Sequence, residues 1–219
     1  PESKDNDFTW KDFQARNNNE LVAIFGNFIN RIVVLTNKYY EGKVPSPNQL
    51  MSVDIETLAK LKAFPGVISS SIERYRFREA SQELINLARL GNKYLADEEP
   101  WKVIKDNPER VQTQMYVALQ IAAALSSLCE PFLPFTATKL SRILKIETKI
   151  DWKTISQTSE LISVGHQIGE AELLFAKIED EEIQKQMDKL EATKVANKEE
   201  IASALAMTEP QKETIQYDD

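Results

Sequence analysis

The stretch that decides the fold is NNNELVAIFGNFINRIVVLTNKYY, residues 17–40. Its large apolar side chains recur at alternating spacings of four and three residues, which is typical of one buried stripe on an amphipathic helix. The stripe consists of Leu21, Phe25, Phe28, Ile32, Leu35 and Tyr39. The pattern therefore predicts a long helix with one face in a hydrophobic core. Asn17 to Asn19 are the candidate N-caps of this helix.

The polar side of this helix carries Asn27 and Arg31, one turn apart, with Lys38 on the same side. An asparagine amide offers both a hydrogen-bond acceptor and donors, and an arginine offers a planar fork of donors. Such a pair is able to recognise the edges of unstacked nucleotide bases. A solvated helix face, with Arg31 in a surface ion pair, is the alternative interpretation of the same residues.

The composition of the 219 residues, 42% hydrophobic and 28% charged, indicates a globular protein with a substantial core. The sequence contains neither an apolar run of membrane-spanning length nor a recognisable signal peptide. The one cysteine, Cys129, has no partner for a disulfide, so we expect a cytoplasmic location. Because the chain begins with Pro1 instead of methionine, we expect it to be a piece of a longer protein.

The net charge of −7 is unevenly distributed along the chain. Residues 177–219 contain 6 lysines and 12 acidic residues, whereas the preceding residues are close to neutral. Non-specific binding of nucleic acid requires a broad basic surface, so we do not expect it here. A specific contact with a few nucleotides remains compatible with this charge.

The remaining sequence predicts further helices joined by short loops. We expect a turn-rich loop at 41–50, a short helix over 54–64 that ends at Pro65-Gly66, and a long helix over 67–95. A short helix should begin near Pro100, and Asn107-Pro108 should open a helix that reaches residue 130. Further helices are expected at 134–146 and 180–194, with extended or irregular chain at 147–176. This arrangement predicts an all-α, antiparallel helical bundle.

The sequence offers no set of residues for bond chemistry. One cysteine and one histidine, His166, do not make a metal site, and no glycine-rich phosphate loop follows a strand. No combination of nucleophile, base and orienting acid is recognisable. We therefore expect neither catalytic residues nor a metal site within this chain.

Four motifs along the chain form a recognisable pattern, and they are NNNELVAIFGNFINR, NKYLADEEPW, CEPFLPFTATKL and IGEAELLFAKIE. Together they resemble bacterial methionyl-tRNA synthetases. The match lies in the part of those enzymes that follows the catalytic core, the helical-bundle anticodon-binding domain of class I aminoacyl-tRNA synthetases. The resemblance implies a connector at 1–16, the bundle at 17–178, and a C-terminal helix with an acidic linker at 179–219.

The resemblance also implies which residues contact tRNA. By the family's motifs, Asn27 and Arg31 project toward the anticodon CAU, and the pair Pro100-Trp101 precedes a short helix. Trp101 would stack on the first anticodon base, cytosine, while Asn27 and Arg31 recognise base edges. An anchor in the core is the alternative role for Trp101. Weaker candidates for tRNA contacts are Lys38, Lys102 and Lys105, for each of which simple solvation is the favoured interpretation.

The same resemblance implies which domains and partners the whole protein would have. The family's adenylate-forming motifs, HIGH and KMSKS, are not in this sequence, so ATP with magnesium and any zinc would belong to a preceding catalytic core. The expected partners are initiator and elongator methionine tRNAs, without DNA or membrane. The end ETIQYDD, residues 213–219, resembles the start of an oligonucleotide-binding domain through which family members dimerise, so we expect this chain alone to be monomeric. A helical protein-interaction module, or the anticodon-binding domain of another class I synthetase, is the alternative function.

Overall fold

The computed structural model describes residues 7–208, and side chains up to residue 204. Its helices follow one another as α1 (Trp10–Arg16), the π-helix η1 (Asn17–Gly26), α2 (Asn27–Tyr40), α3 (Ser52–Glu73), α4 (Phe77–Glu98), α5 (Pro100–Val103), α6 (Pro108–Leu128), α7 (Pro134–Ile143), α8 (Trp152–Gln157) and α9 (Asp180–Thr208). The ends 1–6 and 209–219, including the expected ETIQYDD motif, lie outside the described residues. Within the described part an isolated β-bridge, Lys43 with Gln167, is the only β-type pairing. The predicted all-α bundle is confirmed.

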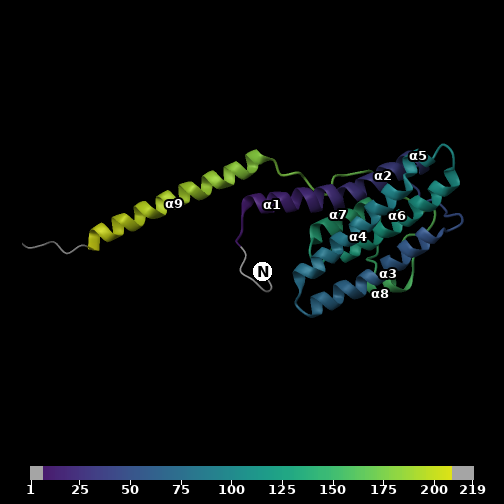
Figure 1. The fold of residues 1–219 in the computed structure, drawn as a ribbon, viewed down its shortest axis with the longest axis horizontal. Coiled ribbons are helices and arrows are strands. Elements are labelled where there is room, and N and C mark those ends of the chain that lie inside the picture. Colours follow the sequence, from purple (N-terminus) through teal and green to yellow (C-terminus); the bar gives the residue numbers. More distant parts are fainter. Residues whose placement is uncertain (1–6, 209–219) are drawn as a thin grey trace, which may run out of the picture. The chain divides into compact units, whose positions relative to one another are not determined.

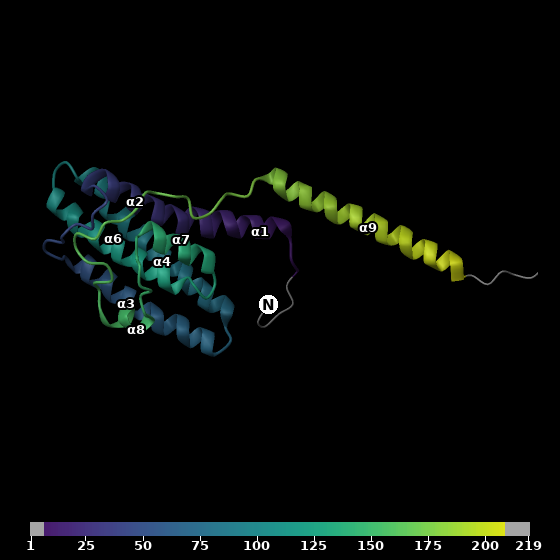
Figure 2. The same ribbon diagram turned by 180° about the vertical axis from the view of Figure 1, so that it is seen from behind.

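Helix α6 is the centre of the bundle. Every residue from Arg110 to Leu128 except Gln112 is buried, as expected of a helix that is covered on all sides. Helices α2, α3, α4 and α7 all contact α6, and Figures 1 and 2 show it from both sides among these neighbours. Small side chains at Ala122, Ala123 and Ala124 occupy its buried middle, where large residues would keep the neighbouring helices apart.

The N-terminal helix begins earlier than predicted. It starts at Trp10 and continues without a break through the π-helical turns of η1 into α2, so Asn17 to Asn19 are not its N-caps. A π-helix has i→i+5 hydrogen bonds, which apolar periodicity alone does not reveal. The predicted stripe is nevertheless buried at its centre, at Phe25, Phe28 and Ile32.

Glycine explains how α2 and α4 approach each other. A Cβ added at Gly91 of α4 would lie 2.4 Å from the ring of Phe28, closer than atoms tolerate. Gly91 is therefore required by close packing, in spite of its cost within a helix. The contact fixes α2 against α4.

The division between α3 and α4 differs from the prediction. Helix α3 continues through the buried Pro65, and the break occurs at Arg74–Arg76, where Tyr75 has a φ of 61° and is 78% exposed. The single helix expected over 67–95 is therefore wrong at this point. A proline removes one helical hydrogen bond, but here the buried side chains of Leu61 and Ile68 hold both halves of α3 in place.

The second half of the chain follows the prediction more closely. Asn107 caps α6 by accepting a hydrogen bond from the Arg110 N–H at 3.0 Å, and Pro108 occupies the first helical position, as predicted. Helix α7 begins at Pro134, also as predicted. The segment 147–176 is mostly irregular but contains the short helix α8, and α9 extends fourteen residues past its predicted end at residue 194.

The chain divides into two compact units. The bundle comprises Ala15–Lys177 and carries all the residues discussed as candidate contacts for RNA. The second unit contains Phe8–Gln14 and the segment that begins at Ile178. Within it the side chain of Gln14 donates to the Ile178 carbonyl at 3.1 Å and to Asp180 at 2.9 Å, and the rings of Phe8, Trp10 and Phe13 contact one another.

Candidate nucleic-acid interface

Helix α2 presents the candidate base-contacting residues of the first motif. Asn27 is exposed and Arg31 is partly exposed, one turn further along. Side-chain hydrogen bonds hold α2 and the preceding π-helical turns of η1 in place, in addition to the packing of their core faces. The side chain of Asn92 on α4 donates to the Ile24 carbonyl at 2.7 Å, and that of Asn37 donates to the Gly169 carbonyl at 3.0 Å.

The short helix α5 presents Trp101. Glu99, which separates α4 from α5, has a left-handed conformation with a φ of 42°, and Pro100 then occupies the first position of α5. Pro100 is buried, and Trp101 is partly exposed with part of its ring packed against the core. The turn at Glu99 and the fixed φ of Pro100 together set the position of Trp101 at the start of α5.

The structure brings Arg31 and Trp101 together, although seventy residues separate them in the sequence. The guanidinium carbon Cζ of Arg31 lies 4.8 Å from the centroid of the Trp101 ring, within the range of a cation–π contact. Asn27 lies on the same helix and lines a surface pocket with residues of two segments, which are Val22, Ala23, Gly26, Asn30, Leu173, Leu174 and Phe175. The direct contact is thus between Arg31 and Trp101, with Asn27 beside it along α2.

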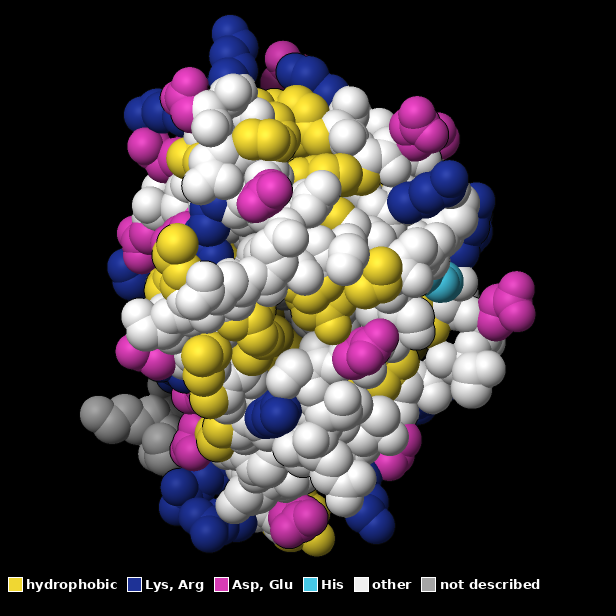
Figure 3. Space-filling model, turned by 90° about the vertical axis from the view of Figure 1, so that its right-hand side faces the viewer, with side chains coloured by type: hydrophobic (Ala, Val, Ile, Leu, Met, Phe, Trp, Pro, Cys, Tyr) yellow, Lys and Arg dark blue, Asp and Glu magenta, His cyan; other side chains and the backbone are white. Residues whose placement is uncertain are grey.

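Two of the three candidate lysines have local partners of their own. Lys38 lies 5.3 Å from the ring centroid of Tyr39, and Lys102 pairs with Glu99 at 2.7 Å. Lys105 is exposed. Figure 3 looks onto the end of the bundle near α5, and there lysine, arginine and acidic side chains alternate around hydrophobic patches. This face lacks a continuous basic surface, which is consistent with the absence of a basic excess in the sequence.

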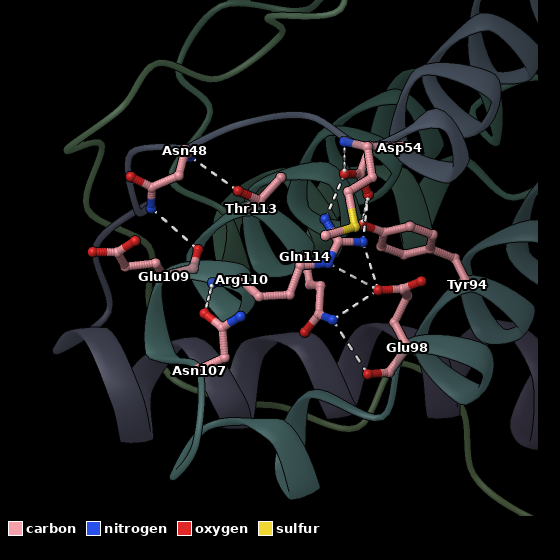
Figure 4. A network of polar contacts seen from close by, with 10 residues as sticks. Asn48, Asp54, Tyr94, Glu98, Asn107, Glu109, Arg110, Thr113 and Gln114 are labelled. Carbon is pink, nitrogen blue, oxygen red and sulfur yellow. Dashed lines mark hydrogen bonds and ion pairs between the residues drawn. The ribbon is translucent and has the colours of Figure 1, made fainter.

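A buried polar network lies directly behind the α4–α5 turn, and sequence analysis missed it. The guanidinium of Arg110 donates to both carboxylate oxygens of Asp54 and to Glu98, with Nη2 of Arg110 2.9 Å from Oδ1 of Asp54. Tyr94 donates its hydroxyl to Asp54 as well, and Gln114 donates to Glu98 (Figure 4). Within the bundle, α3, α4 and α6 all contribute to this network.

The electrostatics of the network favour an ionised Asp54 and a protonated Tyr94. Burial by itself would raise the pKa of Asp54, but hydrogen bonds from Arg110, Tyr94 and the Met51 N–H outweigh it and hold the pKa below its usual range. Burial and the hydrogen bond to Asp54 raise the pKa of Tyr94, so the phenol stays protonated. A sequence signal that could have pointed to it is Arg110, which with Glu109 is one of the two charged residues of α6.

Neither a metal-binding cluster nor a membrane-spanning helix occurs in the part of the chain that the structure describes. Among residues 7–208 no group of three histidine, cysteine, aspartate or glutamate side chains has a geometry that could hold a metal ion. In the same residues no helix has both the length and the apolar character needed to cross a membrane.

Comparison with protein families gives two matches. Residues 44–195 match the family described as the anticodon binding domain of methionyl tRNA ligase, and residues 1–33 match that of class I tRNA synthetases (M). Trp101 lies in the first match and Arg31 in the second, so their contact joins the two matched segments.

Individual relatives agree with these families. The chain is 73% identical over 219 residues to a methionine–tRNA ligase of Flavobacterium psychrophilum, and 66% identical over 245 aligned residues to one of Flavobacterium johnsoniae. All of the chain aligns in both cases, to 31% and 34% of those proteins, so it spans about a third of their length.

The fold recurs in a solved structure. The apo form of Mycobacterium tuberculosis methionyl-tRNA synthetase superposes with a TM-score of 0.72 at 18% identity, over 78% of this chain and 35% of that one. The same enzyme bound to methionyl-adenylate gives 0.72 at 19% identity, over 77% of this chain and 34% of that one. At such identities the likeness shows a shared fold.

Proposed function

The chain belongs to the family of anticodon-binding domains of methionyl-tRNA ligase, and from this premise we propose that its bundle recognises the anticodon CAU of methionine tRNA. Initiator and elongator methionine tRNAs share this anticodon, so both are proposed partners. The proposal extends to the whole protein, a cytoplasmic methionine–tRNA ligase that uses ATP to attach methionine to its tRNA. The observation that carries the proposal is the contact between Arg31 and Trp101.

Trp101 is proposed to stack on the first anticodon base. Anticodon bases are single-stranded and can be splayed outward, so that they stack on an aromatic ring and expose their edges. Each such stack contributes about 1–3 kcal/mol. The partly exposed ring of Trp101, presented by the fixed backbone at Pro100, is a suitable surface for one base.

Arg31 is proposed to change partner when the base arrives. Its cation–π contact with Trp101 is worth about 0.5–1 kcal/mol at an exposed site, less than a stacked base gains. A base that takes this ring face therefore displaces the guanidinium. The planar donor fork of Arg31 is then free to hydrogen-bond the base edge, and Asn27, one turn away, offers an amide for the neighbouring base.

Binding of two stem-loops tests this function. One carries the anticodon CAU and the other differs only in its first base, with uracil in place of cytosine. We expect the chain to bind the CAU loop more tightly at moderate salt, where non-specific attraction is weak. Equal affinity for the two loops would contradict base recognition and favour the alternative, a surface that binds a partner protein through Trp101.

A further inference from the structure

We propose that Arg110, Glu98 and Gln114 form a clamp that positions Trp101 for the stack. The proposal rests on the function proposed above and assigns these three residues a positioning role, since none of them is proposed to touch RNA. The clamp is defined by hydrogen bonds from the guanidinium of Arg110 and the amide of Gln114 to Glu98.

The clamp closes the segment that carries the tryptophan. Glu98 is the last residue of α4, and Arg110 lies in the first turn of α6. Between them the chain makes the left-handed turn at Glu99, forms α5 and reaches the Asn107 cap. The Nε of Arg110 donates to Oε2 of Glu98 at 3.0 Å and thereby ties the two ends of this segment together.

Gln114 holds the backbone at the start of the same segment. Its Nε2 donates to Oε2 of Glu98 at 2.8 Å and also to the Glu98 carbonyl at 3.2 Å. That carbonyl directly precedes the left-handed residue Glu99, so the bond restrains the point at which the chain turns toward Trp101. Figure 4 shows Gln114 and Arg110 approaching Glu98 from α6.

The far side of the clamp is anchored in the core. Arg110 makes a bidentate pair with Asp54, whose side chain is fully buried. Asp54 also accepts hydrogen bonds from the Met51 N–H at 2.8 Å and from the Tyr94 hydroxyl. Because Asp54 on α3 fixes the guanidinium independently of Glu98, its position does not depend on the short segment that it restrains.

The need for a clamp follows from the length of α5. A helix of four residues has no stability of its own, and packing covers only part of the Trp101 ring. A buried group of charges contributes little net stability, because desolvation offsets the attraction. The side chains of Arg110 and Glu98 are only 7% and 18% exposed, so a fixed geometry for the turn is the better explanation of their burial.

The test removes Glu98 and keeps the buried pair of Arg110 with Asp54. We expect Glu98→Ala to remain folded, to exchange the backbone amides of residues 99–107 faster, and to bind the CAU stem-loop about tenfold more weakly with reduced preference over the changed loop. Glu98→Gln retains an oxygen that accepts from Arg110 and should recover part of both losses.

Asp97→Ala is the matched control. It removes the same charge one residue earlier, but breaks only an exposed pair in which Lys93 lies 2.6 Å from Asp97. The clamp is refuted if Glu98→Ala lowers only the stability of the fold. In that case the amides of residues 99–107 would exchange at the same rate as in Asp97→Ala, and both variants would bind the RNA with the same affinity. If the unmodified chain itself fails to discriminate the loops, the proposed function fails, while the exchange data still report whether the clamp restrains the segment.

Discussion

At the scale of single residues, one contact links the two candidate motifs. Arg31 comes from the long N-terminal helix and Trp101 from a helix of four residues, and Cζ of the arginine lies 4.8 Å from the centroid of the tryptophan ring. The sequence suggested each residue separately, as a polar pair on a helix face and as a Pro-Trp dipeptide. Their proximity is a tertiary property, and only the folded bundle provides it.

Truncation of Trp101 should separate tRNA recognition from the chemistry of activation. In the full-length ligase we expect Trp101→Ala to lower kcat/KM for tRNA by about tenfold or more, because one base stack is lost. Methionine-dependent exchange of pyrophosphate with ATP should be unchanged. Phe135→Ala is the control, since Phe135 is an aromatic residue of the same bundle that is 91% exposed. A parallel loss of activation would indicate a folding role for Trp101 instead.

Replacement of Arg31 by lysine should reduce the preference for the CAU loop, although it keeps the positive charge. The ammonium of lysine keeps the positive charge but lacks the planar fork that binds a base edge by two hydrogen bonds. Arg31→Lys is expected to reduce the ratio of affinities for the CAU loop and the changed loop by about tenfold, with little change in the salt dependence of binding. Lys38→Gln is the control, and if it has any effect it should weaken the binding of both loops equally. A ratio that stays constant in Arg31→Lys while both loops bind more weakly would assign Arg31 to phosphate contacts instead.

At the scale of elements, the helix starts marked by proline were predictable, whereas the predicted N-caps at Asn17 to Asn19 and the interior irregularities were not as expected. Asn107-Pro108 and Pro134 begin helices as predicted, because side-chain capping and the fixed φ of proline act locally. Pro65 was expected to end a helix, yet α3 continues through it, since packing of its neighbours in the core outweighs one lost hydrogen bond. The π-helical turns of η1 and the left-handed Tyr75 were not predicted either, since neither leaves a mark in the apolar periodicity of the sequence.

The same limit applies to the site. The candidate contact residues were recognisable from local motifs, whereas the network of Asp54, Glu98 and Arg110 joins three helices and leaves no periodic pattern. A carboxylate in the first turn of a helix looks like an ordinary capping residue, and Asp54 indeed accepts the Met51 N–H. Its second partner, Arg110, is fifty-six residues away in the sequence.

The network should be visible in the acid dependence of stability. The folded pKa of Asp54 lies below its unfolded value of about 3.9, so its stabilising effect is complete above that pH and is lost as the pH falls through the folded pKa. We expect the free energy of unfolding in urea to fall less steeply below about pH 4 in Asp54→Asn than in the unmodified chain. Asp97→Asn, at an exposed pair, should retain the steep fall. Identical profiles for Asp54→Asn and the unmodified chain would mean that Asp54 is not ionised in the fold.

At the scale of the whole molecule, the net charge of the chain does not favour the binding of RNA. The chain carries a net charge of −7, concentrated after residue 176, and the face near α5 mixes both signs (Figure 3). The proposed recognition of tRNA therefore rests on a few directed contacts with bases. The chain spans about a third of the length of the relatives it matches.

The central claim is that a first anticodon base stacks on Trp101, and the fluorescence of that residue tests it most directly. With Trp10 and Trp152 replaced by phenylalanine, Trp101 is the one remaining tryptophan of the three in the chain. We predict that the CAU stem-loop quenches its emission and shields it from acrylamide, at concentrations that leave the loop with uracil in the first position without effect. Binding of the CAU loop is measured independently by the fluorescence anisotropy of a labelled RNA. If that loop binds tightly while the emission and acrylamide quenching of Trp101 stay unchanged, the claim is contradicted.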